Sequence, residues 1–170
     1  KKFAKKISKN NIIVKDNYIK YKTISLIINK KEYHITSFRE DLISYGRSAL
    51  VNIASSLKDD VKRRDFTINS LYLDSKGNLT DFFNGENDLI KRKLVFIGNP
   101  VERIEEDYLR IIRFCRFSGN FDYKMSKNLK KEITLRVPKI IYLSNKRIRD
   151  EIDKILLTKN CYKCFLMMTK

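Results

Sequence analysis

The spacing of the apolar residues changes at Gly98, and this change most limits the folds open to the chain. Before Gly98 the apolar residues come in short β-branched or alternating runs, such as ISLII at 24–28 and the segment 32–38, which are typical of strands. After Gly98 they recur at the spacing of amphipathic helices. We therefore predict an α+β fold, with a mixed part over residues 1–98 and an all-helical part over residues 99–170.

Turn-forming residues divide the first part further. Residues 29–31 predict a turn between the two strands, and residues 2–9 predict a short basic helix before them. A second turn is predicted at 74–78, where DSKGN precedes a short apolar run at 79–83. Another short apolar run lies at 94–97.

The second part contains residues that start and stop helices. Asn99 can cap a helix whose first residue is Pro100. A second helix is predicted at 126–136, before Pro138, and Ser144 can cap a third. The third helix has apolar residues at the spacing of a buried face: Ile148, Ile152, Ile155 and Leu156.

The chain is strongly basic, and the charge is concentrated at its two ends. Its 170 residues include 37 Lys and Arg against 20 Asp and Glu, a net charge of +17. Residues 1–31 hold ten Lys and one acidic residue, and residues 124–170 hold 13 basic and 4 acidic residues. Such flanks favour a polyanionic partner such as RNA. Because Lys supplies 25 of the 37 basic residues, an AT-rich coding sequence is an alternative explanation.

The composition also limits the class of protein. Apolar residues make up 42% of the chain, which is typical of a globular protein. No apolar run approaches the roughly 18 residues that a membrane span requires, so we expect no membrane partner. The first residues begin with Lys1 rather than Met and do not resemble a secretory signal. Three cysteines are too few for a disulfide framework, so we expect a reducing, cytoplasmic location.

Cys161 and Cys164 form a C-x-x-C pair in a segment at 160–168 that we predict to be helical. A structural zinc site needs four ligands, and the sequence has no second pair nearby. The apolar residues around both cysteines favour packing in the core. His34 is the only histidine in the sequence. A catalytic site in which a histidine activates a serine or cysteine nucleophile is therefore disfavoured.

A predicted helix at 105–117 carries a stripe of charge on an otherwise apolar segment. Its charged residues recur every three positions: Asp107, Arg110, Arg113 and Arg116. Arginines on a mostly buried helix require anionic partners, because an unpaired buried charge is very costly. Either the stripe is solvated, with a weak Asp107–Arg110 pair, or it faces a cleft where it meets phosphates and a base.

Asp107 and Arg110, one helical turn apart in this prediction, have the chemistry to read a base. Cytosine and adenine both present an amino donor beside a ring nitrogen that accepts a hydrogen bond. A carboxylate can accept from the amino group while a guanidinium donates to the ring nitrogen. Guanine and uracil present the reversed pattern and would leave both side chains mispaired. The pair permits selection of C and A, although its spacing alone does not establish it.

A second basic cluster, KRRDFTIN, lies at 62–69. Two arginines followed by an acid suit contact with a triphosphate and a ribose hydroxyl. A basic patch on a surface loop would have the same composition, so the segment alone is a weak indication.

Four segments of the chain resemble, in order, the motifs of one family. RRDFTIN at 63–69 lies within a matching stretch at 57–89, and EDYLRIIRFCRF follows at 106–117. ITSFR at 35–39 and SNKRIRDEIDKIL at 144–156 complete the set. Together they resemble the class II tRNA nucleotidyltransferases of bacteria, which comprise the CCA-adding enzymes and the related poly(A) polymerases. The resemblance covers nearly the whole chain.

The resemblance implies that four side chains contact the incoming nucleotide. Arg64 matches an arginine that contacts the nucleotide, and Asp65 matches its partner near the ribose. Arg113 and Arg116 match further nucleotide-contacting arginines.

Asp107 and Arg110 match the pair that acts as an amino-acid template for CTP and ATP. The implied fold is a β-sheet head of the nucleotidyltransferase type, of which residues 1–98 are the C-terminal part. An all-helical neck that binds RNA and nucleotide follows at 99–170. The implied partners are the tRNA 3′ end, CTP and ATP.

The chain departs from the family at its metal site. The family's Asp-x-Asp pair and Gly-Gly segment occur nowhere in the sequence, and His34 stands where the family often has an acid. Mg²⁺ is therefore an implied cofactor whose ligands are not in this chain, and no catalytic or metal-binding residue is assigned. We expect a fragment that binds nucleotide weakly without catalysis, its carboxylates lying upstream in a longer protein or on a partner chain.

Two other functions stay open at this point. The poly(A) polymerase branch of the family would use only ATP. A non-catalytic RNA-binding derivative would show no preference for CTP over UTP, and its RNA affinity would fall steeply with salt.

Overall fold

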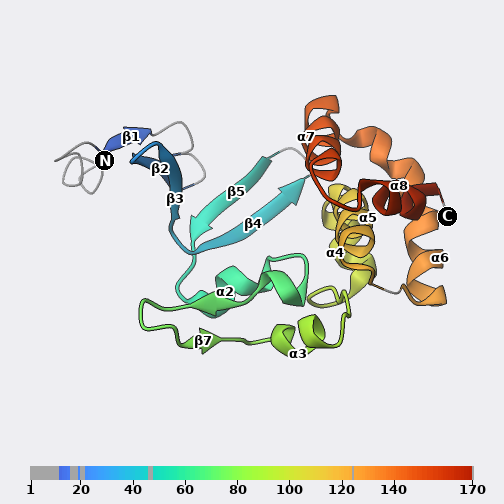
Figure 1. The fold of residues 1–170 in the computed structure, drawn as a ribbon, viewed down its shortest axis with the longest axis horizontal. Helices are drawn as coiled ribbons and strands as arrows, with labels where there is room; N and C mark the ends of the chain where they lie inside the picture. Colours follow the sequence, from blue (N-terminus) through green and yellow to red (C-terminus); the bar gives the residue numbers. More distant parts are fainter. Residues whose placement is uncertain (1–11, 16–18, 20–21, 46–47, 124, 170) are drawn as a thin grey trace. The chain divides into compact units, whose positions relative to one another are not determined.

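The structure is a computed structural model. It describes residues 12–15, 19, 22–45, 48–123 and 125–169. The chain divides into two compact units, formed by Lys1–Ile43 with Leu50–Asp60 and by Ser44–Ala49 with Val61–Lys170. Strands dominate the early part and helices the later part, which confirms the predicted α+β class (Figure 1). Across the ranges described, no helix combines the length and hydrophobicity needed to cross a membrane.

A three-stranded antiparallel sheet lies in the first unit. Its strands pair in the order β1 (Ile13–Lys15), β2 (Thr23–Ile28) and β3 (Lys31–Thr36). The predicted hairpin is confirmed, since Asn29 and Lys30 join β2 to β3 with φ angles of 49° and 65° that suit a tight turn. Ser25 and His34 lie opposite each other, with Ser25 Oγ 2.8 Å from His34 Nδ1. The predicted helix at 2–9 lies outside the described residues.

A second, two-stranded sheet is formed by β4 (Arg39–Tyr45) and β5 (Ser48–Ile53), and α2 (Leu57–Lys62) follows it. Ser56 and Asp59 start α2 by exchanging hydrogen bonds. The Ser56 hydroxyl donates to the Asp59 carboxylate at 2.6 Å and accepts from the Asp59 N–H at 3.3 Å. This exchange satisfies a backbone donor at the helix start.

A short hairpin joins β6 (Tyr72–Leu73) to β7 (Leu79–Thr80), as the turn residues predict. The Asp74 carboxylate closes the turn by accepting from the N–H groups of Lys76 and Asn78, both at 2.8 Å. The apolar run at 79–83 is a strand only over Leu79 and Thr80. From Asp81 onward the chain turns toward α3 (Gly85–Ile90). The Asp81 carboxylate accepts hydrogen bonds from backbone N–H groups before and at the start of that helix.

The remaining elements are helices: α4 (Pro100–Glu106), α5 (Leu109–Phe121), α6 (Lys127–Arg136), the 3₁₀ segment η3 (Val137–Tyr142), α7 (Asn145–Leu156) and α8 (Cys161–Thr169). The predicted starts of α4, α6 and α7 are confirmed. The side chain of Asn99 accepts from Val101 N–H at 2.9 Å, and that of Ser126 accepts from Leu129 N–H at 3.2 Å. Ser144 stands at the N-cap position of α7, although its side chain makes no capping hydrogen bond there.

The prediction of one continuous helix at 105–117 is wrong. α4 ends at Glu106, and Asp107 adopts an extended conformation with φ −156° and ψ 104°. α5 then begins at Leu109, whose N–H donates to the Asp107 carboxylate at 3.2 Å. Because the Asp107 side chain satisfies a backbone donor of the new helix, it starts α5 instead of continuing α4.

The main apolar core joins α5 to the loops before it. Its buried residues are Phe66, Leu94, Phe96, Ile104, Ile111, Phe114, Tyr123 and Ile133. Phe66 is fully buried, and its ring lies 4.8 Å from that of Phe96 and 6.1 Å from that of Phe114. The apolar run at 94–97 is thus core rather than strand, although Phe96 forms an isolated β-bridge with Phe66.

A second apolar cluster packs α5 against α7 and α8 (Figure 1). Ile112, Ile155 and Cys164 are buried in it, and Cys161 packs against it, which confirms that the C-x-x-C pair belongs to the core. Ile148 and Ile152 of α7 also pack there. The assignment of Leu156 to the buried face is wrong, because its side chain is 59% exposed.

Candidate nucleotide-binding site

A cavity of about 400 Å³ in the second unit gathers the predicted nucleotide-binding residues with the exception of Arg116. It is lined by Arg63, Arg64, Asp65, Asn69, Asp107, Arg110, Arg113 and Phe117. Three pieces of chain supply these side chains: the loop after α2, the junction of α4 with α5, and α5 as far as Phe117. Segments that are some forty residues apart in sequence therefore meet at one site.

The loop at 63–69 is held in place by Phe66, which fills the core between Phe96 and Phe114. On either side of Phe66 the backbone is fixed as well. Thr67 N–H donates to Val95 O, and Ile97 N–H donates to Asp65 O, both at 3.0 Å. These contacts position the residues before Phe66 at the cavity.

Arg103 of α4, with its side chain only 11% exposed, holds the backbone of the two arginines in this loop. Its Nη2 donates to Arg63 O at 2.6 Å and to Arg64 O at 2.7 Å. The Arg64 guanidinium lies over the Tyr72 ring, 5.7 Å from the ring centroid. The sequence analysis did not identify Arg103. Its position on the first turns of a helix gave no indication of a partner 40 residues away.

Asp65 is buried and fully engaged. Its Oδ1 accepts from Phe66 N–H at 2.9 Å and from Asn69 Nδ2 at 3.0 Å, while its Oδ2 accepts from Arg113 Nε at 2.7 Å. Burial by itself would raise the pKa of Asp65, but Arg113 and these hydrogen bonds outweigh it and keep the pKa below its usual value. Asp65 is therefore an ionised residue that orients Arg113.

Arg113 and Arg116 share a carboxylate on α7. Arg113 Nη1 lies 3.3 Å from Glu151 Oε1, and Arg116 Nε lies 3.0 Å from Glu151 Oε2. Lys154 Nζ is 2.7 Å from the same group. Glu151 is 2% exposed; burial would raise its pKa, but Lys154 and the two arginines keep it below its usual value.

The requirement of buried arginines for anionic partners is thus met within the protein. Glu151 was not predicted as a site residue. Its position could have indicated a buried charge that needs a partner, because it lies on the same helix face as the apolar residues Ile148 and Ile155. Arg116 is drawn toward Glu151 and lies over the Phe117 ring, 4.4 Å from its centroid, outside the cavity lining.

Asp107 and Arg110 both line the cavity but have different partners. Asp107 Oδ2 accepts from Arg147 Nη2 of α7 at 2.6 Å. Arg110 Nη1 donates to Glu106 Oε2 at 2.6 Å and to Arg103 O. The weak Asp107–Arg110 pair, one of the two interpretations of the stripe, is replaced by these two separate pairs.

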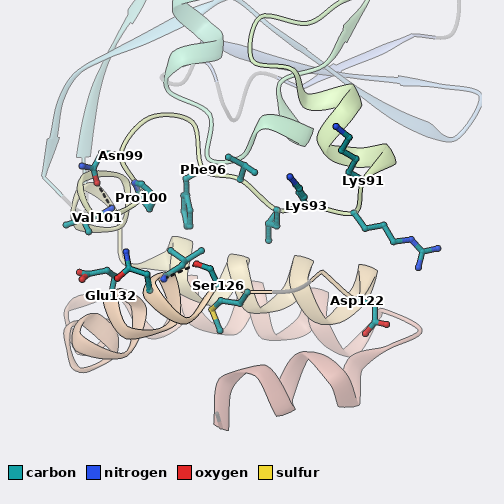
Figure 2. A pocket seen from close by; sticks show the side chains of 15 residues that line it. Lys91, Lys93, Phe96, Asn99, Pro100, Val101, Asp122, Ser126 and Glu132 are labelled. Carbon is teal, nitrogen blue, oxygen red and sulfur yellow. Dashed lines mark hydrogen bonds between the residues drawn. The ribbon is translucent and has the colours of Figure 1, made fainter.

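A larger cavity of about 1110 Å³ lies between the segment 91–96 and α6 (Figure 2). Lys91 and Asp122 lie at one end of it, and Asn99 and Glu132 at the other (Figure 2). Its interior is largely apolar, and it contains none of the predicted nucleotide-binding residues. We favour the smaller cavity as the nucleotide site because arginines dominate its lining, as a triphosphate requires.

A metal site would need several carboxylate, imidazole or thiol groups close together. Among the described residues, no three carboxylate, imidazole or thiol groups converge in a way that could hold an ion. None of these described residues is therefore assigned as a metal ligand.

Comparison with known proteins places these observations in a family. Residues 1–95 match the poly(A) polymerase head domain, and residues 122–170 match a domain described as the probable RNA and SrmB-binding site of polymerase A. A CCA-adding enzyme of Streptococcus gordonii is 41% identical over 141 residues, covering 82% of this chain. One of Bacillus licheniformis is 37% identical over 139 residues, covering 81% of this chain. The chain spans 35% of the length of each.

Solved structures of CCA-adding enzymes have a fold similar to that of this chain. The CCA-adding enzyme of Bacillus stearothermophilus in complex with CTP matches 92% of this chain and 38% of its own, with a TM-score of 0.80 and 26% identity. The CCA-adding enzyme of Thermotoga maritima complexed with tRNA matches 99% of this chain and 38% of its own, with a TM-score of 0.70 and 26% identity. The match to the head domain over more than half the chain, with these relatives, confirms the resemblance of the motifs. The chain belongs to the poly(A) polymerase head-domain family, as a relative of the CCA-adding enzymes.

Proposed function

We propose that the protein is a template-independent nucleotidyltransferase that adds C and A to the 3′ end of tRNA, with CTP and ATP as substrates. This chain would supply the nucleotide-selecting part, with residues 1–98 as the C-terminal part of the head and residues 99–170 as the neck. The observation that carries the proposal is the cavity in which Asp107 and Arg110 meet the arginines of the loop at 63–69. The CCA-adding relatives favour this activity over the poly(A) branch.

The charges of the cavity suit a nucleoside triphosphate. Arg63, Arg64 and Arg113 can contact phosphate oxygens, and guanidinium groups are well shaped for this because they donate two parallel hydrogen bonds. Asp65 would lie near the ribose, as the family resemblance implies. Arg116, outside the cavity lining, would contribute through the carboxylate that it shares with Arg113.

Base selection would rest on Asp107 and Arg110. The Asp107 carboxylate would accept from the amino group of cytosine or adenine, and Arg110 would donate to the adjacent ring nitrogen. With uracil or guanine the carboxylate would face a carbonyl oxygen and the guanidinium an N–H group. Such mispaired groups in a partly buried site would disfavour UTP and GTP.

The family implies Mg²⁺, which would activate the primer hydroxyl and bind the triphosphate. Its ligands are not assigned to this chain, so the role of the described residues is to bind and orient the nucleotide. The reaction would take place in the cytoplasm, where the free thiols Cys115, Cys161 and Cys164 stay reduced.

Equilibrium binding of the four nucleoside triphosphates to the 170-residue chain tests the proposal. We expect CTP and ATP to bind tighter than UTP and GTP by about tenfold, the effect of one mispaired buried group. Equal binding of all four, as a non-catalytic RNA-binding protein would show, would overturn the proposal. Preference for ATP alone would support the poly(A) branch.

The activity itself is tested by purifying the protein from its native source and supplying CTP with a tRNA that lacks its CCA end.

A further inference from the structure

We infer that Arg147 is a positioning residue for base selection: it holds the Asp107 carboxylate toward the cavity and away from Arg110. This inference rests on the proposed function, and it assigns a role to a residue of α7 that does not line the cavity.

The position of Asp107 in the chain makes an external support necessary. Its backbone is extended between two helices, so the side chain is not confined by a helical turn. Two donors orient the carboxylate instead: Leu109 N–H at 3.2 Å from Oδ1 and Arg147 Nη2 at 2.6 Å from Oδ2. Each carboxylate oxygen can accept two hydrogen bonds, so both retain capacity for a base amino group.

A second ion pair keeps Arg110 away from Asp107. Arg110 N–H donates to Asp107 O at 3.0 Å, so the two residues adjoin at the start of α5. Their side chains could close on each other, which would satisfy both and leave neither for a base. The pairing of Arg110 with Glu106 and of Asp107 with Arg147 prevents this closure. The acceptor and the donor of the proposed template are therefore held by different partners.

The helix that carries Arg147 is itself firmly anchored next to α5. Ile155 is buried in the apolar cluster between these helices, and Ile148 packs against it. Glu151, one turn after Arg147, binds both Arg113 and Arg116. Because Arg147 and Glu151 are spaced i, i+4, a single face of α7 supports both the base-reading and the phosphate-facing side chains of the proposed site.

The role of Arg147 predicts a specific defect. When Arg147 is removed, the Asp107 carboxylate gains rotational freedom and can close on Arg110. The arginines that would contact phosphates keep their own partners, so the affinity for UTP should change little. The affinity for CTP should fall, because the hydrogen bond from its amino group is lost.

The test compares the chain with its Arg147→Ala, Arg147→Lys and Arg149→Ala variants in equilibrium titrations with CTP and UTP. Arg149 is an exposed arginine on the same helix, and its substitution removes the same charge from a different face. We expect the preference for CTP over UTP to fall about tenfold in Arg147→Ala, the effect of one lost charge-assisted hydrogen bond. Arg147→Lys should restore part of the preference, and Arg149→Ala should retain it. In an Asp107→Ala background, Arg147→Ala should have no further effect on the ratio.

The outcomes separate the inference from the proposed function. A parent chain without any preference for CTP would overturn the proposed function, and the inference with it. A parent chain that prefers CTP, with an Arg147→Ala variant that prefers it equally, would overturn the inference alone. Equal losses of CTP and UTP affinity would show a merely structural role and would also overturn it. Melting temperatures establish that each variant is folded, and Arg147→Lys decides the question if Arg147→Ala does not fold.

Discussion

Arg113 of α5 binds one oxygen of the Asp65 carboxylate through two nitrogens: Nε lies 2.7 Å and Nη2 lies 2.6 Å from Oδ2. The Asp65 side chain is 8% exposed and that of Arg113 is 27% exposed. The contact ties the loop at 63–69 to a helix almost fifty residues later in the chain. Since Arg113 also binds Glu151, one arginine links three segments around the proposed nucleotide site.

Replacing Arg113 by Met should lower the free energy of unfolding by about 3 kcal/mol, because breaking a buried ion pair leaves an uncompensated charge. Here Asp65 and Glu151 would both lose a partner. Urea denaturation followed by circular dichroism measures the change. The matched control is Lys163→Ala, which removes an exposed pair with Asp122 at 3.1 Å and should cost about 0.5 kcal/mol or less. Similar losses in both variants would contradict the buried-pair argument.

The stability of the fold should decrease in acid because of Asp65 and Glu151. Their folded-state pKa values lie below the usual values of 3.8 and 4.5. Such groups stabilise the fold above the unfolded-state pKa, and the contribution is lost as the pH falls through the folded-state pKa. We therefore expect the free energy of unfolding to decrease below about pH 4.5.

The variants Asp65→Asn and Glu151→Gln isolate this effect. Each should be less stable than the parent chain near neutral pH and should show a weaker loss of stability in acid, since the titrating group is gone. Denaturation series at several pH values measure both changes. Asp122→Asn, at an exposed position, serves as the control for the removal of a carboxylate. If the stability of every variant decreased in acid as steeply as that of the parent chain, Asp65 and Glu151 would be excluded as the source of the acid sensitivity.

Replacing Asp107 by Ala should remove the preference for CTP over UTP and leave the affinity for the triphosphate group nearly unchanged. The reason is that the carboxylate is the proposed acceptor for the base amino group, whereas the phosphates would face Arg63, Arg64 and Arg113. Competition of CTP, UTP and inorganic triphosphate for the chain measures both properties. Glu102→Ala, an exposed acid on α4, controls for the loss of a negative charge. A variant that still selects CTP would exclude Asp107 as the base reader.

At Gly119 the backbones of α5 and α8 lie close together. A Cβ atom at this position would lie 2.4 Å from Cys164 Cα, so the helices could not keep their present separation. We expect Gly119→Ala to lower the free energy of unfolding by about 1–3 kcal/mol through overpacking. Thermal or urea denaturation checks this value. Leu156→Ala, at a side chain that is 59% exposed, should change stability far less.

Several features of the fold could be predicted from the sequence because they depend on neighbouring residues. The starts of α4 and α6 follow from Asn99 and Ser126, whose side chains bind N–H groups two or three residues later. The β2–β3 turn follows from residues that tolerate positive φ. The nucleotide-site residues were predicted from their resemblance to family motifs, and the structure brings them to one cavity with the exception of Arg116.

The partners of Asp107, Arg113 and Arg116 could not be predicted from local sequence. Glu151 meets Arg113 and Arg116, and Arg147 meets Asp107, across separations of 35 to 40 residues. The break between α4 and α5 was also missed, because a helical apolar pattern continues through Asp107.

By itself, the sequence determined which residue types stand in each motif and where most helices and turns begin, since caps and turns are short-range interactions. Only the tertiary structure decided that Arg113 and Arg116 share Glu151 and that Arg147 binds Asp107, since these pairs depend on how α7 packs against α5. It also decided that the Asp107 carboxylate is held apart from Arg110, because its partner Arg147 is brought to it by the fold from 40 residues away.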